Sequence, residues 1–242
     1  MKNLLLLALF ALTFTAYADD ETAVAQPRDG ENVENNFDWR VRAAFPATGV
    51  AAVDAQVSAF LKNFLAQQIA ASSTGEVFAP HNATLTVAGK LTRPSDKAVS
   101  VVLLMDNYEQ SAAHPSHLTR VLNYELSGAA LPFNKIFGQP EKALTIFAAR
   151  APALALEQLK KIVAGDGALA QPDADDLQEM LTGFQDGFAA TTENYATVGL
   201  EPAGVRLYFQ EYQIAPYSFG MPTVLIPLAD LADAEPNLEL WN

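Results

Sequence analysis

Residues 209–227 read FQEYQIAPYSFGMPTVLIP, and the rest of the chain is best interpreted from this stretch. Residues 205–210 alternate apolar and polar side chains, which is the period of a half-buried β-strand. Pro216 then restricts its own φ angle and the residue before it, and Gly220 accepts backbone angles closed to other residues. Residues 223–227 resume the alternation and end in proline. The stretch therefore predicts a strand, a rigid aromatic corner and a second strand.

An amphipathic helix and a strand meander are predicted in the first half of the chain. Over residues 50–71 the apolar residues recur at helical spacing, which is typical of a core-facing stripe. They are Val53, Val57, Phe60, Leu61, Phe64, Leu65 and Ile69. Alternation predicts a first strand over residues 37–43 and three antiparallel strands over residues 83–91, 98–108 and 118–126. Because residues 98–108 are apolar on both faces, we expect them to form a central strand covered on each side.

Two helices are predicted in the second half. The first covers residues 140–165, and Pro152 inside it removes one backbone donor, so we expect a kink or a split there. The second begins near Pro172. The acidic residues in its first turn (Asp173, Asp175 and Asp176) favour a helix start, because negative charge stabilises the positive end of the helix dipole. These acids are therefore interpreted as helix starters and not as catalytic carboxylates.

The pattern returns to strands at residues 195–198, and a last short helix is predicted over residues 228–234. The elements together predict an α+β fold with antiparallel sheets packed against helices, in two consecutive βα-meander units. We place the N-terminal α+β unit at residues 37–106 and the C-terminal α+β unit at residues 107–242.

The N-terminus has the features of a secretory signal peptide over residues 1–18. Lys2 precedes an apolar run, and Ala16, Tyr17 and Ala18 form an A-x-A cleavage site. The run is shorter than the roughly 20 residues that span a bilayer. The polar, acidic residues 19–36 are expected to form a flexible leader. We therefore expect a bacterial periplasmic or secreted protein without a membrane anchor after cleavage.

Composition restricts the partner classes. The chain has no cysteine, which excludes disulfides and thiol catalysis. Its formal charge is −13, and loss of Lys2 with the signal peptide would make it −14. This acidity argues against nucleic acid as a partner. It favours a basic partner, although acidity also serves solubility.

Two motifs carry a family resemblance. Seven residues of the corner match an aromatic "Y-x-I-A-P-Y" signature with a following glycine and proline: Tyr212, Ile214, Ala215, Pro216, Tyr217, Gly220 and Pro227. Residues 113–115 and 123–128 resemble an "A-H-x…N-x-D-L-x-T-G" hairpin, with Glu125 and Ser127 at the aspartate and threonine positions. The pattern over roughly residues 37–233 resembles the extracytoplasmic domain shared by RsiV-type anti-sigma factors and the non-catalytic part of PdaC-type peptidoglycan deacetylases.

The resemblance implies a non-catalytic binding domain that recognises a cell-envelope component. RsiV-type domains sense lysozyme, so the partner is expected to be a basic, lysozyme-like protein or peptidoglycan. The candidate binding residues are the aromatics and the histidine near the two motifs: His114, Tyr124, Tyr212, Tyr217 and Phe219. Tyrosine suits such a surface because it combines a rigid apolar ring with one hydrogen-bonding group.

The alternative is a small metal-dependent hydrolase that acts on envelope polymers. His114 and His117 have H-x-x-H spacing, and with Asp106 or Glu109 they are candidate zinc ligands. The sequence contains no H-E-x-x-H, G-x-S-x-G, P-loop or Rossmann motif. A Ser-His-Asp triad requires only closeness in space, so it stays open at this point. We predict no catalytic residue, no bound metal and no cofactor, and the enzyme alternative stays open.

Overall fold

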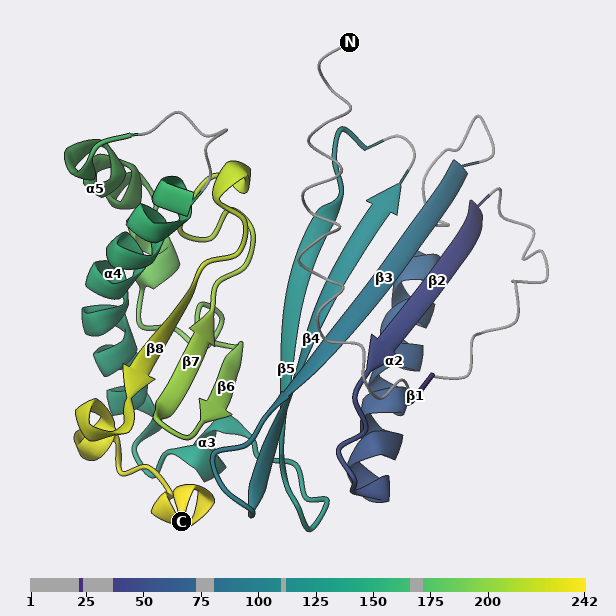
Figure 1. The fold of residues 1–242 in the computed structure, drawn as a ribbon, viewed down its shortest axis with the longest axis horizontal. Helices are drawn as coiled ribbons and strands as arrows, with labels where there is room; N and C mark the ends of the chain where they lie inside the picture. The colour runs from purple at the N-terminus through teal and green to yellow at the C-terminus, as the bar shows by residue number, and fades with distance from the viewer. Residues whose placement is uncertain (1–21, 24–36, 73–80, 110–111, 166–171) are drawn as a thin grey trace.

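The computed structural model describes residues 22–23, 37–72, 81–109, 112–165 and 172–242, which are arranged in four layers (Figure 1). A five-stranded sheet and a three-stranded sheet face each other. Helix α2 (Ala51–Ser72) covers the outside of the larger sheet, and helices α4 (Pro140–Gly165) and α5 (Ala174–Gly183) cover the outside of the smaller one. The α+β prediction is confirmed.

The larger sheet has the strand order β1-β2-β3-β4-β5. Its strands are β1 (Thr22–Ala23), β2 (Phe37–Phe45), β3 (His81–Thr92), β4 (Ala98–Glu109) and β5 (Ser116–Glu125). β3, β4 and β5 pair antiparallel, as the meander predicted. β2 pairs parallel with β3, because helix α2 carries the chain back across the sheet between them.

Strand β1 lies within the predicted leader, and it pairs with the end of β2 through Phe45 and Ala44. The predicted signal peptide and the other residues of the predicted leader lie outside the described residues. The predicted division after residue 106 falls inside β4, so the five-stranded sheet continues past it to β5.

The first core lies between α2 and the larger sheet. Val53, Val57 and Leu61 are buried there, and the other described members of the predicted stripe are half-buried against them. Ile69 lies outside the residues whose side chains are described. Four residues of β4 face α2: Val99, Val101, Leu103 and Met105. The opposite face of β4 lies under the smaller sheet, so both faces of this central strand are covered.

The smaller sheet has the order β6-β7-β8 and is antiparallel. Its strands are β6 (Val198–Glu201), β7 (Gly204–Tyr208) and β8 (Thr223–Pro227), and short helices accompany it: α3 (Phe133–Ile136), η2 (Gln185–Phe188), η3 (Tyr217–Phe219), η4 (Leu228–Ala234) and η5 (Leu238–Trp241). The strand predicted over residues 195–198 thus begins only at Val198. The last short helix lies where it was predicted.

Helix α4 runs without interruption through Pro152, so the predicted split at this residue is wrong. The reason is its buried face. Phe147, Ala151, Ala155 and Leu159 are fully buried against the smaller sheet and hold the two halves in one helix. Helix α5 begins as predicted, and Asp173 forms a capping box with Asp176.

The aromatic corner has the predicted order of strand, corner and strand. β8 ends at Pro227, and Gly220 has a φ of 66°, which side-chain-bearing residues rarely adopt. The half-buried expectation for the strand before it is wrong. Phe209 is buried on the apolar side, as the pattern predicts, but Tyr208 on the polar side is buried as well. The larger sheet covers that side, where Lys90 of β3 lies 5.4 Å from the centre of the Tyr208 ring.

Polar side chains join the two sheets. Ser100 on β4 donates to the side-chain oxygen of Asn123 and accepts the backbone N–H of Leu200 at 2.7 Å. The Asn123 amide then donates to the carbonyl of Val198 at 2.8 Å. These bonds fix β6 over β4 and β5.

No helix in the described part of the chain is long and apolar enough to cross a membrane.

Candidate functional site

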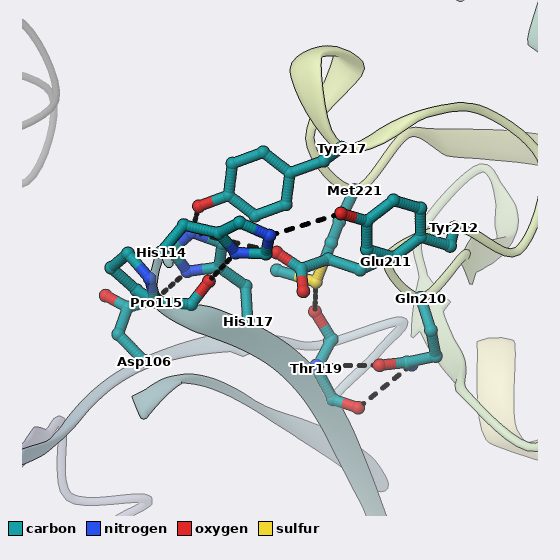
Figure 2. Close-up of polar contacts among 10 residues, drawn as sticks. All are labelled: Asp106, His114, Pro115, His117, Thr119, Gln210, Glu211, Tyr212, Tyr217 and Met221. Atoms are coloured by element: carbon teal, nitrogen blue, oxygen red, sulfur yellow. Dashed lines mark hydrogen bonds and ion pairs between the residues drawn. The ribbon is translucent and has the colours of Figure 1, made fainter. Parts of the chain in front are cut away.

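The candidate site lies where the β4–β5 hairpin meets the aromatic corner (Figure 2). β4 supplies Asp106, the start of β5 supplies His117, and His114 lies just before β5. The corner between β7 and β8 of the smaller sheet supplies Glu211, Tyr212 and Tyr217. The site therefore spans the junction of the two sheets.

His117 is the central polar residue of the site. It lies opposite Asp106 in the β4–β5 register, and its Nδ1 is 2.5 Å from the Asp106 carboxylate. Its Nε2 is 3.0 Å from the hydroxyl of Tyr217 and 3.7 Å from the carboxylate of Glu211. With Nδ1–H donating to Asp106, Nε2 of the neutral ring accepts from Tyr217. In the imidazolium, both nitrogens donate.

The surroundings of His117 favour its charged form. The hydrogen bond to Asp106 raises the pKa of His117, and the negative charges of Asp106 and Glu211 raise it further, while burial acts in the opposite direction. Burial also raises the pKa of the Tyr217 phenol, together with the nearby charge of Glu211. Tyr217 is therefore a neutral phenol near pH 7, and His117 holds a proton more tightly than a free histidine does.

Three rings form the exposed part of the site, and we call His114, Tyr212 and Tyr217 the ring cluster. The His114 ring centre is 4.1 Å from that of Tyr217 and 6.5 Å from that of Tyr212. The two tyrosine rings are 6.1 Å apart, and the Tyr212 hydroxyl lies 3.3 Å from His114 Nε2. Tyr212 is 51% exposed. These rings offer one apolar surface with hydrogen-bonding groups at its rim.

The backbone at Tyr212 has a φ of 59°, which is uncommon for a residue with a side chain. Such a conformation persists only where surrounding contacts hold it. Gln213 provides them: its side-chain amide donates to the carbonyls of Gly187 and Asn194, and its oxygen accepts the N–H of Gln210. The segment that carries Tyr212 is therefore fixed to the body of the protein.

Gln210 fixes the same segment to the other sheet (Figure 2). Its side-chain oxygen accepts the backbone N–H of Thr119, and its amide donates to the Thr119 carbonyl, both at 3.1 Å. The amide also donates to the Thr197 hydroxyl. Because Thr119 lies on the edge strand β5, one glutamine side chain satisfies backbone groups that the sheet leaves unpaired there.

The structure brings together three of the five predicted binding residues, His114, Tyr212 and Tyr217. Phe219 is half-buried against the core of the smaller sheet. Tyr124 lies elsewhere: it is only 6% exposed and belongs to the core beneath α2. Neighbouring residues of a strand point to opposite faces, so Asn123 faces the smaller sheet while Tyr124 faces the helix.

The prediction did not include Asp106, His117 and Glu211 among the binding residues. His117 and Asp106 were weighed only as zinc ligands, and their direct hydrogen bond depends on the β4–β5 register. Within the described part of the chain, no group of three or more His, Asp or Glu residues is placed to hold a metal ion. Asp106 and His117 lie opposite each other in the β4–β5 register. The pair could have been found from the sequence only if the alternation of the two strands had fixed that register.

A shallow pocket of about 330 Å³ lies on the outer, helical side of the molecule. It is lined by Ala148, Pro152, Gln178, Leu181, Thr182, Gln185, Phe188 and Ala189. None of these residues is charged, and the pocket shares no residue with the ring cluster. It offers no group for acid–base or nucleophilic chemistry beyond two hydrogen-bonding amides and one hydroxyl.

Residues 145–229 match the family described as "Protein of unknown function (DUF3298)". A crystal structure of a DUF3298 family protein from Pseudomonas aeruginosa PAO1 is similar to this chain, with a TM-score of 0.52 and 18% sequence identity. The similarity covers 82% of this chain and 88% of that chain. This similarity shows that the two proteins share a fold.

A member of the same family from Bacteroides fragilis NCTC 9343 is matched with a TM-score of 0.45 and 21% identity, over 76% of this chain and 66% of that chain. No curated protein matches the chain.

Proposed function

We propose that this protein is an exported, non-catalytic binding domain that recognises a cell-envelope component through the ring cluster. The observation that carries the proposal is the packing of three rings against one another, on backbone that both sheets hold in place. Rigid tyrosines are the side chains that most often anchor protein and ligand interfaces. Little ordering entropy is lost when a ligand binds a surface already fixed in this way.

The electrostatics of the site argue against catalysis. Asp106, His117 and Tyr217 are connected in the order of a carboxylate, an imidazole and a hydroxyl, as in a nucleophilic triad. Such a triad needs a neutral imidazole that takes a proton and a hydroxyl that releases one. Here the pKa values of both His117 and Tyr217 are raised, so each group holds its proton more tightly than the free side chain does, which opposes both transfers. The same groups are well suited to donate hydrogen bonds to a ligand.

The proposed location rests on residues 1–18, which have the features of a signal peptide. The resemblance of the two motifs to RsiV-type and PdaC-type extracytoplasmic domains supports an envelope ligand.

Two ligand classes fit this proposal, a basic lysozyme-like protein and peptidoglycan. The formal charge of −13 favours the first through long-range attraction, and the ring cluster favours the second through contact with sugar rings.

Calorimetric titration of the purified chain with lysozyme and with soluble peptidoglycan fragments tests the proposal. We expect saturable binding of at least one of the two, with no change in the mass of the fragments. If lysozyme binds, its affinity must fall as salt rises, because exposed charges are screened over about 8–10 Å at physiological ionic strength. Chelator-sensitive cleavage of the fragments would instead support the metal-dependent hydrolase alternative.

A further inference from the structure

The face of the larger sheet that looks toward the smaller sheet is only partly covered. β6 lies over β4 and β5, where Ser100 and Asn123 bind it. Farther across the sheet, Arg40 and Arg42 on β2 and Thr86 on β3 are exposed. Their strand neighbours Val41 and Leu85 point the other way, into the core beneath α2. Among the described residues, none covers the β2–β3 half of this face, and this half is therefore open there.

The strand register arranges the open half in two rows that run across the strands. In the first row, Arg40 pairs with Thr84 and Thr84 pairs with Tyr108. Tyr108 is one of the exposed large hydrophobic side chains, at 38%. We call Arg40, Arg42, Thr84, Thr86 and Tyr108 the open face.

The second row connects the open face to the ring cluster. Arg42 pairs with Thr86, Thr86 with Asp106, and Asp106 with His117. His117 in turn contacts Tyr217. Since neighbouring strands are about 4.8 Å apart, this row spans roughly 14 Å from Arg42 to His117. That length accommodates more than one sugar ring of an extended glycan.

The open face is positive on a protein whose formal charge is −13. Among the residues that the structure describes, neither Arg40 nor Arg42 has an ion-pair partner. Lys90 adds a third positive charge on the same face, 5.4 Å from the centre of the Tyr208 ring. The carboxylate of Asp106 is bonded to His117 and is not directed at an arginine. The local charge thus fits an anionic ligand.

We propose that the open face binds a carboxylate-bearing glycan strand of the peptidoglycan type, laid across the strands from the arginines to the ring cluster. The inference rests on the proposed function and selects its ligand class. Each arginine fork can bind a carboxylate through two hydrogen bonds, and the threonine hydroxyls can bind sugar hydroxyls. The Tyr108 ring offers a flat apolar surface to a sugar ring. Tyr108 is the one large apolar side chain of the open face, and a protein interface usually buries a larger apolar centre than one ring.

Two peptide-free tetrasaccharides test the inference. One has alternating N-acetylglucosamine and N-acetylmuramic acid, and the other is chitotetraose, which lacks the lactyl carboxylate. Calorimetry of the wild-type chain should give at least about fivefold tighter binding of the muramic acid tetrasaccharide. The free energy behind a fivefold difference in affinity is smaller than the usual contribution of one hydrogen bond to a charged group. Equal affinity for the two glycans would overturn the inference.

The variant Arg40→Ala/Arg42→Ala removes the proposed carboxylate contacts. We expect it to bind the muramic acid tetrasaccharide about tenfold more weakly, to lose most of the salt dependence, and to bind chitotetraose as the wild type does. The control Lys62→Ala/Lys142→Ala removes the same charge from exposed positions on α2 and α4, outside the two sheets, and should bind as the wild type does.

The outcomes separate the two proposals. Wild-type binding that Tyr217→Ala weakens but Arg40→Ala/Arg42→Ala leaves unchanged would overturn the inference and leave the proposed function standing. If neither tetrasaccharide binds, the inference is wrong, and lysozyme titration decides whether the proposed function stands with the other ligand class.

Discussion

His117 on β5 and Tyr217 on η3 are joined by a hydrogen bond of 3.0 Å between the imidazole Nε2 and the phenolic oxygen, although 100 residues separate them. The bond ties the larger sheet to the corner of the smaller one. Ser100 and Asn123 tie the sheets together farther along β4 and β5. The ring cluster therefore sits on a junction that is bonded at two places, which keeps its rings in fixed positions.

The first prediction concerns the pH dependence of stability. Because the pKa of His117 is raised in the folded state, its stabilising effect is complete below the unfolded pKa of about 6.5 and is lost as pH rises through the folded value. His117→Gln cannot titrate. The difference in unfolding free energy between wild type and variant, measured in urea, should be larger near pH 5.5 than near pH 9.

Asp106→Asn removes the main cause of the shift and should abolish most of this pH dependence. A wild-type-to-variant difference for His117→Gln that grows toward alkaline pH would contradict the assignment.

The second prediction concerns Gln210. Gln210→Ala removes the partner of the Thr119 backbone N–H and one of the two donors to its carbonyl, the other being the Arg120 guanidinium, and Thr119 is buried. We expect a loss of about 1–3 kcal/mol in unfolding free energy, the usual cost of unsatisfied buried polar groups. The exposed Gln185 on η2 provides the matched control, since Gln185→Ala should change stability by less than about 0.5 kcal/mol. Equal effects of the two substitutions would show that the edge of β5 does not need Gln210.

The third prediction concerns the core beneath α2. Leu61 is buried and Phe60 on the same helix is only half-buried. Leu61→Ala should therefore cost about 2–5 kcal/mol, and Phe60→Ala less. Asn63→Ala, at an exposed position of α2, serves as the control and should leave the melting temperature nearly unchanged. A greater loss for Phe60→Ala than for Leu61→Ala would mean that the helix presents a different face to the sheet.

Local patterns predicted most of the fold. The apolar stripe of α2 and the two-sided strand β4 were correct, because each periodicity reflects a surface that the folded chain covers. The acidic start of α5 was correct because capping is a contact between residues close in sequence. The split expected at Pro152 as one of two outcomes does not occur, because the core that holds α4 together is made of residues far along the chain.

The site was only partly predictable for the same reason. The aromatics and the histidine near the two motifs suggested His114, Tyr212 and Tyr217, which the structure brings together, but they also suggested Phe219 and the buried Tyr124. Which face of β5 meets the corner depends on the packing of two sheets. The contacts of His117 with Asp106 and of Gln210 with Thr119 depend on strand register and on that same packing.

The fourth prediction concerns export. Residues 1–18 have a charged start, an apolar run and an A-x-A site, so the exported chain should begin at Asp19. N-terminal sequencing of the protein from the periplasmic fraction of an expressing bacterium checks this. Recovery of the uncleaved chain in the membrane fraction would contradict it.

The fifth prediction tests the central claim, that the ring cluster binds an envelope component without turning it over. Wild type, Tyr217→Phe and Tyr217→Ala are titrated calorimetrically with soluble peptidoglycan fragments and with lysozyme. Mass spectrometry then measures the fragments after incubation. Tyr217→Phe keeps the ring and should keep most of the affinity, whereas Tyr217→Ala should lose more than about 1 kcal/mol of binding free energy. The fragments should be recovered intact. No binding of either ligand, wild-type affinity in Tyr217→Ala, or fragments cleaved by the wild-type chain would contradict the account.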